Sequence, residues 1–129
     1  MRMKRIIVIG AVIAGFAFSV FGEEVNYTEL NEKIIELFKT GQNKQAFDLG
    51  NQYVDQIKKK FQAAKSINAD EITFLVNQGV VSKQVKEYKA ARDILNLAVE
   101  CKAKTAPPGD PLFVSIYKTL ADIYLAMKD

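Results

Sequence analysis

Histidine is absent from this chain of 129 residues, and cysteine occurs only once, at Cys101. Without histidine the chain lacks the commonest general base and metal ligand at neutral pH. A single cysteine can form neither an intramolecular disulfide nor a His/Cys zinc cluster. Gly-rich phosphate loops, Ser-centred nucleophile elbows and hydrolase motifs are also missing from the sequence. We therefore expect no catalytic residues, no cofactor and no bound metal.

Strict alternation of apolar and polar residues, the pattern of a half-buried strand, is missing too. The nearest candidate is residues 72–81, but Asn77, Gln78 and Gly79 interrupt it. Five helices are predicted instead, over residues 27–40, 44–64, 69–85, 88–104 and 111–128. The sequence therefore predicts an all-α fold.

The first 22 residues have the layout of a secretory leader. Arg2, Lys4 and Arg5 precede an apolar run over residues 6–21, and the junction between Gly22 and Glu23 is the expected cleavage site. The run is shorter than the roughly 20 residues that usually span a bilayer. We expect an exported bacterial protein, periplasmic or secreted, with an inner-membrane anchor formed by residues 6–21 as the alternative.

The positive net charge of the chain belongs to this leader. Three of the 18 basic side chains and none of the 15 acidic ones lie in residues 1–22, so 15 of each sign remain. A neutral body lacks the charge on which nucleic-acid affinity mostly depends. We expect no nucleic-acid partner, and membrane contact only through an uncleaved leader.

Short polar motifs predict where helices begin and end. Asn26 precedes Glu29 by three residues, and Asn68 precedes Glu71 by the same distance, so each pair is a variant of the capping box. Gly41 can end the first helix in the left-handed conformation. Other charged groups are explained by helix ends: Lys58 to Lys60 as a solvated C-terminal end, and acidic pairs such as Asp70-Glu71 as partners of the N-terminal dipole.

Core positions are predicted by helical spacing. Cys101 continues a buried series in the fourth helix and is expected to be a small apolar core residue, although pairing with another chain is the alternative. Gly79 in the third helix suggests that another backbone approaches closely there.

Similar apolar anchors recur at a nearly constant interval. From Ala46 to Ala91 is 45 residues, and from Gly79 to Ala121 is 42, which is typical of stacked helical hairpins. The predicted units cover residues 27–65 and 69–105, followed by a half-repeat or capping helix over 111–128. The anchors are Leu30, Ile34, Leu37 and Ala46, then Leu75, Gly79 and Ala91, then Tyr117, Ala121 and Tyr124.

These units resemble the tetratricopeptide repeat (TPR) family in its long-repeat, kinesin light chain-like form. The second unit carries most of the resemblance, whereas the first has Ile34 where the family prefers Gly or Ala and Gly50 where it prefers an aromatic residue. A different helical bundle remains the alternative. The clearest positions are Leu75, Gly79, Tyr88, Ala91, Leu95 and Ala98.

The resemblance implies a right-handed superhelix whose concave side binds a protein or peptide through the first helix of each hairpin. It implies a partner-binding groove of nine residues, although Ile35 and Val80 could instead pack against neighbours. Those two residues also interrupt any carboxylate clamp. The nine are Asn31, Ile35, Phe38, Thr73, Asn77, Val80, Ser115, Lys118 and Asp122.

We therefore expect an exported scaffold that binds a partner in the cell envelope. One alternative is a small-ligand-binding accessory subunit of an envelope transport system, with a pocket lined by tyrosines 53, 88, 117 and 124. Another is a structural protein that self-associates, because an uncapped repeat end exposes an apolar face. The last helix is interpreted as a cap on the stack, or alternatively as the start of a further unit in a longer array.

Overall fold

The computed structural model describes residues 25–107 and 109–128. Over these residues it is all-α and has no strand, as the sequence predicts, and each helix begins and ends within one residue of its predicted bounds. The predicted leader, with its junction at Gly22 and Glu23, lies outside the described residues. The helices are α1 (Tyr27–Lys39), α2 (Asn43–Ala64), α3 (Ala69–Gln84), α4 (Tyr88–Ala103) and α5 (Pro111–Lys128).

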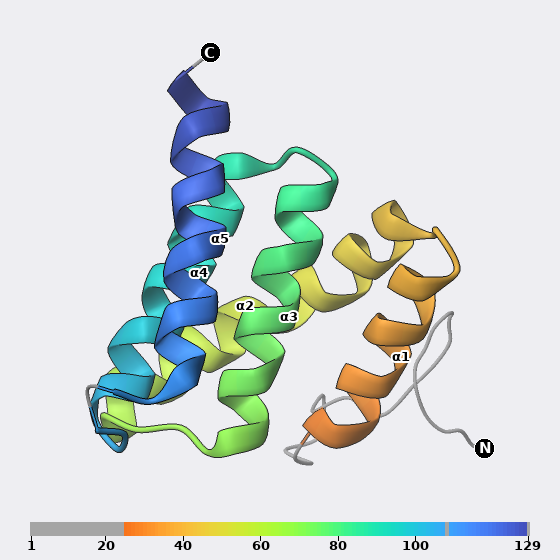
Figure 1. Cartoon of the computed structure of the whole chain (residues 1–129). Helices are drawn as coiled ribbons and strands as arrows, with labels where there is room; N and C mark the ends of the chain where they lie inside the picture. The colour runs from red at the N-terminus through yellow and green to blue at the C-terminus, as the bar shows by residue number, and fades with distance from the viewer. Residues whose placement is uncertain (1–24, 108, 129) are drawn as a thin grey trace, which may run out of the picture.

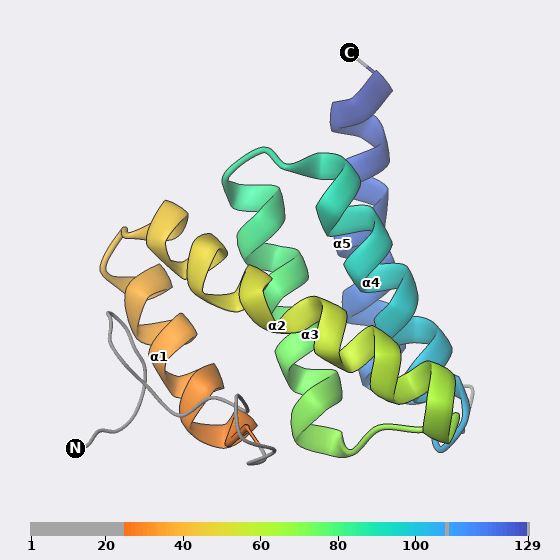
Figure 2. The same cartoon turned by 180° about the vertical axis from the view of Figure 1, so that it is seen from behind.

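The helices lie in two layers. In Figure 1, α1, α3 and α5 run side by side in front and point the same way. In Figure 2, which shows the molecule from behind, α2 and α4 are in front. α3 packs against α1, α2 and α4, whereas α5 packs mainly against α4 and has few contacts with α3. The first helix of each predicted hairpin therefore lies in one layer and the second helix in the other.

Both predicted N-terminal caps are present, but they differ in completeness. The Asn68 side chain accepts a hydrogen bond from the Glu71 backbone N–H at 2.8 Å, and the Glu71 carboxylate accepts one from the Asn68 N–H at 2.8 Å. This is a full capping box. Asn26 accepts from the Glu29 N–H at 3.1 Å, but the Glu29 carboxylate accepts from the Asn26 side-chain amide instead. Only α3 therefore has the reciprocal backbone bond.

Helices α1 and α3 end in the same motif, and their lengths explain the two repeat intervals. Gly41 has φ +81°, and Gln42 N–H donates to the Leu37 carbonyl after α1, as in a Schellman motif. After α3, Lys86 takes the same place with φ +67°, and Glu87 N–H donates to the Ser82 carbonyl. α1 has 13 residues and α3 has 16. Residues before the turn, in α1 and α3, therefore correspond at an interval of 42. Residues after the turn, in α2 and α4, correspond at 45, because α3 is three residues longer than α1.

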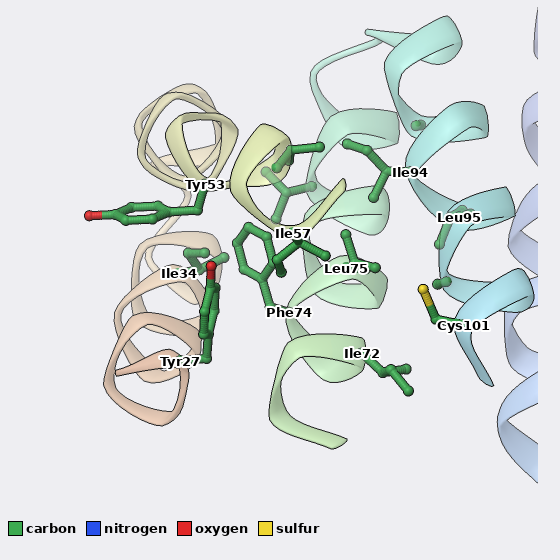
Figure 3. Packing of buried hydrophobic residues seen from close by; sticks show 14 of the residues in the cluster. Tyr27, Ile34, Tyr53, Ile57, Ile72, Phe74, Leu75, Ile94, Leu95 and Cys101 are labelled. Carbon is green, nitrogen blue, oxygen red and sulfur yellow. The ribbon is translucent and has the colours of Figure 1, made fainter. Parts of the chain in front are cut away.

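One core connects all four hairpin helices (Figure 3). Phe74 of α3 is fully buried, and its ring centroid lies 5.4 Å from that of Tyr27, which also packs edge-on against Tyr53. Burial raises the pKa of Tyr53 to about 12. Cys101 is 2% exposed, so its predicted burial is confirmed.

Two helical glycines each leave room for a side chain from another helix. A Cβ at Gly79 would lie 2.5 Å from the Leu95 side chain, so the predicted close approach exists but comes from a side chain and not from a backbone. A Cβ at Gly50 would collide with the buried Gln78 side chain. Gln78 Nε2 donates to the Phe47 carbonyl at 2.9 Å and thereby ties α3 to α2. Gly50 thus makes space for a buried polar contact.

The prediction of which α5 residues point inward is wrong. Tyr117, Ala121 and Tyr124 are exposed, although the repeat pattern predicts an inward position for them. The residues that face the body lie one position earlier along the helix, because the packing of α5 on α4 selects that stripe. They are Phe113, Ile116, Leu120 and Ile123.

Candidate functional site

Two hydrogen bonds at the start of α1 and α3 fix how these helices lie against each other. Thr28 Oγ1 donates to Asp70 Oδ2 at 3.0 Å, and Asn31 Nδ2 donates to the Asp70 carbonyl at 3.2 Å. Thr28 and Asp70 are 42 residues apart, which is the repeat interval between the first helices of the two units, α1 and α3. Because the two helices are parallel, we infer that residues 42 apart lie at the same height along the helix axes. Ile35 of α1 is therefore level with Asn77 of α3.

The six predicted binding residues on these helices recur at spacings of three and four, so they share one side of the α1–α3 pair. We call this set the inner face. Thr73 is exposed and Ile35 is 37% exposed. The others are less accessible than a groove lining requires: Phe38 packs against the core, and Asn31 is only 7% exposed. The inner face consists of Asn31, Ile35, Phe38, Thr73, Asn77 and Val80.

Two polar atoms of the inner face are buried and have no hydrogen-bond partner. They are Asn31 Oδ1, an acceptor, and Asn77 Nδ2, a donor. Buried polar atoms are nearly always hydrogen-bonded in native proteins, so each such atom requires an explanation. Asn43 Oδ1 and Gln78 Oε1, outside the inner face, are also buried without a hydrogen-bond partner. On the inner face the two atoms are an acceptor and a donor, the types of group that pair with the N–H and the C=O of a peptide. The amide of Asn31 is already oriented by its bond to the Asp70 carbonyl.

The three predicted residues on α5 do not join the inner face directly. Ser115, Lys118 and Asp122 are all exposed. Asp122 Oδ2 pairs with Lys83 Nζ of α3 at 3.3 Å, and this ion pair links the two helices. α5 therefore offers a polar, charged continuation of the layer and not a third copy of the α1–α3 arrangement.

A part-buried ion pair between a half-exposed lysine of α2 and a buried glutamate of α3 was not predicted. The Glu71 side chain is 4% exposed, and its Oε2 accepts a hydrogen bond from Lys60 Nζ at 2.7 Å. Lys60 was predicted to be part of a solvated helix end, and Glu71 to be the capping-box partner of Asn68 and a partner of the helix dipole. Because Glu71 also accepts from the Asn68 N–H, both carboxylate oxygens are engaged. This cluster holds α2 to α3 and has no free group for chemistry.

The electrostatic effects of this cluster reach neighbouring groups. Burial and, to a lesser extent, the Glu71 carboxylate raise the pKa of the Tyr27 hydroxyl above its usual value. Burial, with the carboxylates of Glu100 and Glu71, raises the pKa of Cys101 to about 11. A thiol with such a pKa is protonated at neutral pH and is a poor nucleophile.

The four tyrosines of the predicted ligand pocket do not come together. Tyr53 is buried beside Tyr27 in the core, and Tyr88 is half-buried at the start of α4. Tyr117 and Tyr124 are 55% and 50% exposed on α5. The side chains therefore belong to different parts of the molecule.

Neither a metal site nor a membrane span is found in residues 25–107 and 109–128. No group of three or more His, Cys, Asp or Glu side chains in these ranges could hold a metal ion. No helix within them combines the length and apolar character needed to cross a bilayer. Comparison of the chain with family models, with curated proteins and with solved structures finds no match.

Proposed function

We propose that this chain is an exported, non-catalytic adaptor built from TPR-like helical hairpins, which binds a protein or peptide of the cell envelope on its inner face. The two-layer arrangement of antiparallel helices supports the TPR-like part of this proposal. The leader-like residues 1–22 support the export part. The neutral charge of the remaining chain favours recognition through shape and a few side chains over recognition through a charged patch.

The observation that carries the proposal is the unpartnered pair of polar atoms, Asn31 Oδ1 and Asn77 Nδ2. Both atoms are enclosed in the unbound chain, so neighbouring side chains would have to move before a peptide segment lying along the layer donated an N–H to the first atom and accepted with a C=O from the second. A buried polar group without a hydrogen bond costs about 1–3 kcal/mol of desolvation free energy. Each bond to the peptide would offset that cost for one group. Ile35, which follows Asn31 by four residues on α1 and is 37% exposed, could contact one apolar side chain of the peptide.

Site-specific photo-crosslinking can test this face. A photoreactive phenylalanine analogue would replace the exposed Thr73 of α3 in the full chain, expressed with its leader in the organism that encodes it. The matched control would carry the same analogue at Asn96, which is exposed on α4 in the other layer. We expect a discrete adduct with an envelope protein from position 73 and none from position 96.

A second substitution makes the test specific to the unpartnered atoms. Asn77→Ala, added to the Thr73 probe, should lower the adduct yield, whereas Asn51→Ala at an exposed position of α2 should leave it unchanged. Equal adducts from both probe positions, or a yield that Asn77→Ala does not change, would count against the inner face as the binding surface.

The mature N-terminus tests the export part separately. Mass spectrometry of the chain isolated from the envelope fraction should give a polypeptide that begins at Glu23. A chain that retains residues 1–22 would instead favour the inner-membrane anchor. Recovery from the cytoplasm alone would contradict export in either form.

A further inference from the structure

A second apolar face runs along α5 beside the one that packs on the body. Its four large members are 50–66% exposed, and Ala121 between them is exposed as well. The spacings of three and four residues place them on one side of the helix. We call this set the α5 stripe: Val114, Tyr117, Ala121, Tyr124 and Leu125.

The stripe lies at the open end of the first layer. Asp122, on another flank of α5, pairs with Lys83 of α3, so that flank is directed toward the rest of the layer. Figure 1 shows α5 as the end helix of the row formed with α1 and α3. The Tyr117 ring stacks against the ring of Phe113, with centroids 6.3 Å apart, and this contact holds it in place. No helix in the described part of the chain covers the stripe.

We propose that the α5 stripe packs against the α5 stripe of a second copy of this chain, with the two helices antiparallel. One register sets each tyrosine against a smaller residue: Tyr117 opposite Ala121 and Tyr124 opposite Val114. Both pairs occur together because seven residues separate Val114 from Ala121 and also Tyr117 from Tyr124. Large side chains facing small ones allow two helices to interdigitate.

The charges around the stripe fit the same register. It brings Lys128 near the last turn of one copy opposite Asp110 at the start of α5 in the other. Asp110 also pairs with Lys102 within its own chain at 3.6 Å, so it would bridge two cations. The two Lys118 side chains flank the two-fold axis, and their long stems can carry the ammonium groups outward into water. A parallel pair would instead align like charges along the whole helix.

The exposed area is appropriate for a weak or moderate dimer. The four large side chains leave on the order of 500 Å² uncovered per copy, within the roughly 300–600 Å² of the largest apolar patch on a typical monomer, a patch that is often functional. Flanking residues bring the sum toward the roughly 800 Å² per partner of a standard interface.

The oligomeric state of matched variants tests the proposal. The full chain would be studied in one mild detergent by analytical ultracentrifugation over a wide concentration range. We expect a monomer–dimer equilibrium for the wild type, retention of the dimer in Ser115→Glu, and its loss in Ala121→Glu. Both substitutions place a carboxylate at an exposed position of the same helix, but only position 121 lies in the stripe.

Three results would overturn the proposal. They are a wild-type chain that stays monomeric at all concentrations, an Ala121→Glu dimer as stable as that of the wild type, and equal loss of the dimer in both variants. The second result would assign the dimer to another surface, such as the apolar leader. Folding of each variant is checked by its helical circular dichroism.

Disulfide trapping tests the orientation. Chains carrying Tyr117→Cys would be mixed with chains carrying Ala121→Cys, both with Cys101→Ala, and oxidised. The antiparallel register predicts that the mixed dimer forms faster than either homodimer. Dominant formation of the position-121 homodimer would refute that register.

Discussion

Replacing Gly50 by alanine should destabilise the protein, although the same change in an exposed helix would stabilise it. Alanine favours a helix interior over glycine by about 1 kcal/mol. At this position the added methyl group would collide with the buried Gln78 side chain. Gln78 would then lose its 2.9 Å bond to the Phe47 carbonyl, which costs about 1 kcal/mol, and the crowding costs about 1–3 kcal/mol more. We expect a net loss of about 1–3 kcal/mol.

A double-mutant cycle isolates this contact. With Gln78→Ala in the background, the obstacle is gone, so Gly50→Ala should become stabilising by about 1 kcal/mol through helix propensity alone. The predicted coupling between the two positions is therefore about 2–4 kcal/mol, at or above the upper end of values for residues in contact. The change of sign is a stronger test than either magnitude.

Urea unfolding followed by the helical circular dichroism signal measures all four members of the cycle. Asn51→Ala serves as the control, because Asn51 is exposed on the same helix and should gain only a few tenths of a kcal/mol from propensity. If Gly50→Ala has the same effect in both backgrounds, the collision with Gln78 does not explain the glycine.

Three further predictions concern single residues. Lys86→Gly should stabilise the fold by about 0.5–1 kcal/mol in urea unfolding, because Lys86 holds a φ of +67° that glycine adopts without strain; destabilisation would show that its side chain matters more. Asn68→Ala should cost about 1–2 kcal/mol, and more than Asn26→Ala, because the Asn68 side chain accepts from the Glu71 N–H in a part-buried bond of 2.8 Å, whereas Asn26 accepts from the Glu29 N–H in an exposed bond of 3.1 Å; equal losses would refute that ranking. Alkylation of Cys101 in the folded chain should stay slow until the pH approaches about 11. Rapid labelling near pH 8 would contradict the burial of this thiol. Because the pKa of Cys101 is higher in the folded chain than in the unfolded chain, the thiol stabilises the fold below pH 9, and this stabilisation is lost as the pH rises from about 9 to 11.

Local signals in the sequence were sufficient to place the helices. The caps at Asn26 and Asn68, the turn at Gly41 and the prolines before α5 act within a few residues, so their effects could be deduced without knowing the fold. The turn at Lys86 shows the boundary of this approach. A lysine gives no sign of a positive φ, yet the chain makes the same Schellman turn there as at Gly41.

Contacts between helices were much less predictable. Two contacts join residues of different helices. Gln78 of α3 fills the space beside Gly50 of α2, and Lys60 of α2 pairs with buried Glu71 of α3. Helical spacing indicates which side of a helix is apolar, but it does not indicate which polar residue on that side finds a partner. A glycine in the middle of a long helix, as at Gly50, was the one available sign that another side chain enters.

The error in α5 has a specific cause. The helix carries two apolar stripes with the same spacing, one residue apart: the stripe through Ile116 and Leu120 packs on the body, and the stripe through Tyr117 and Ala121 is exposed. Periodicity alone gives both the same weight, so the inward one is decided by the packing of α5 on α4. The repeat interval favoured Ala121 because it lies 42 residues after Gly79, but α5 has fewer contacts with α3 than α3 has with α1.

The proposed inner face and the α5 stripe make different demands on the molecule and do not compete. The inner face lies on α1 and α3, whereas the stripe lies on the end helix and outside the inner face. Dimerisation through the stripe would therefore leave both inner faces free. A dimer of this kind would bind a partner that displays two copies of a peptide more tightly than one that displays a single copy, because the second contact becomes intramolecular. Ala121→Glu should then weaken binding to the divalent partner and leave the affinity for a single peptide unchanged.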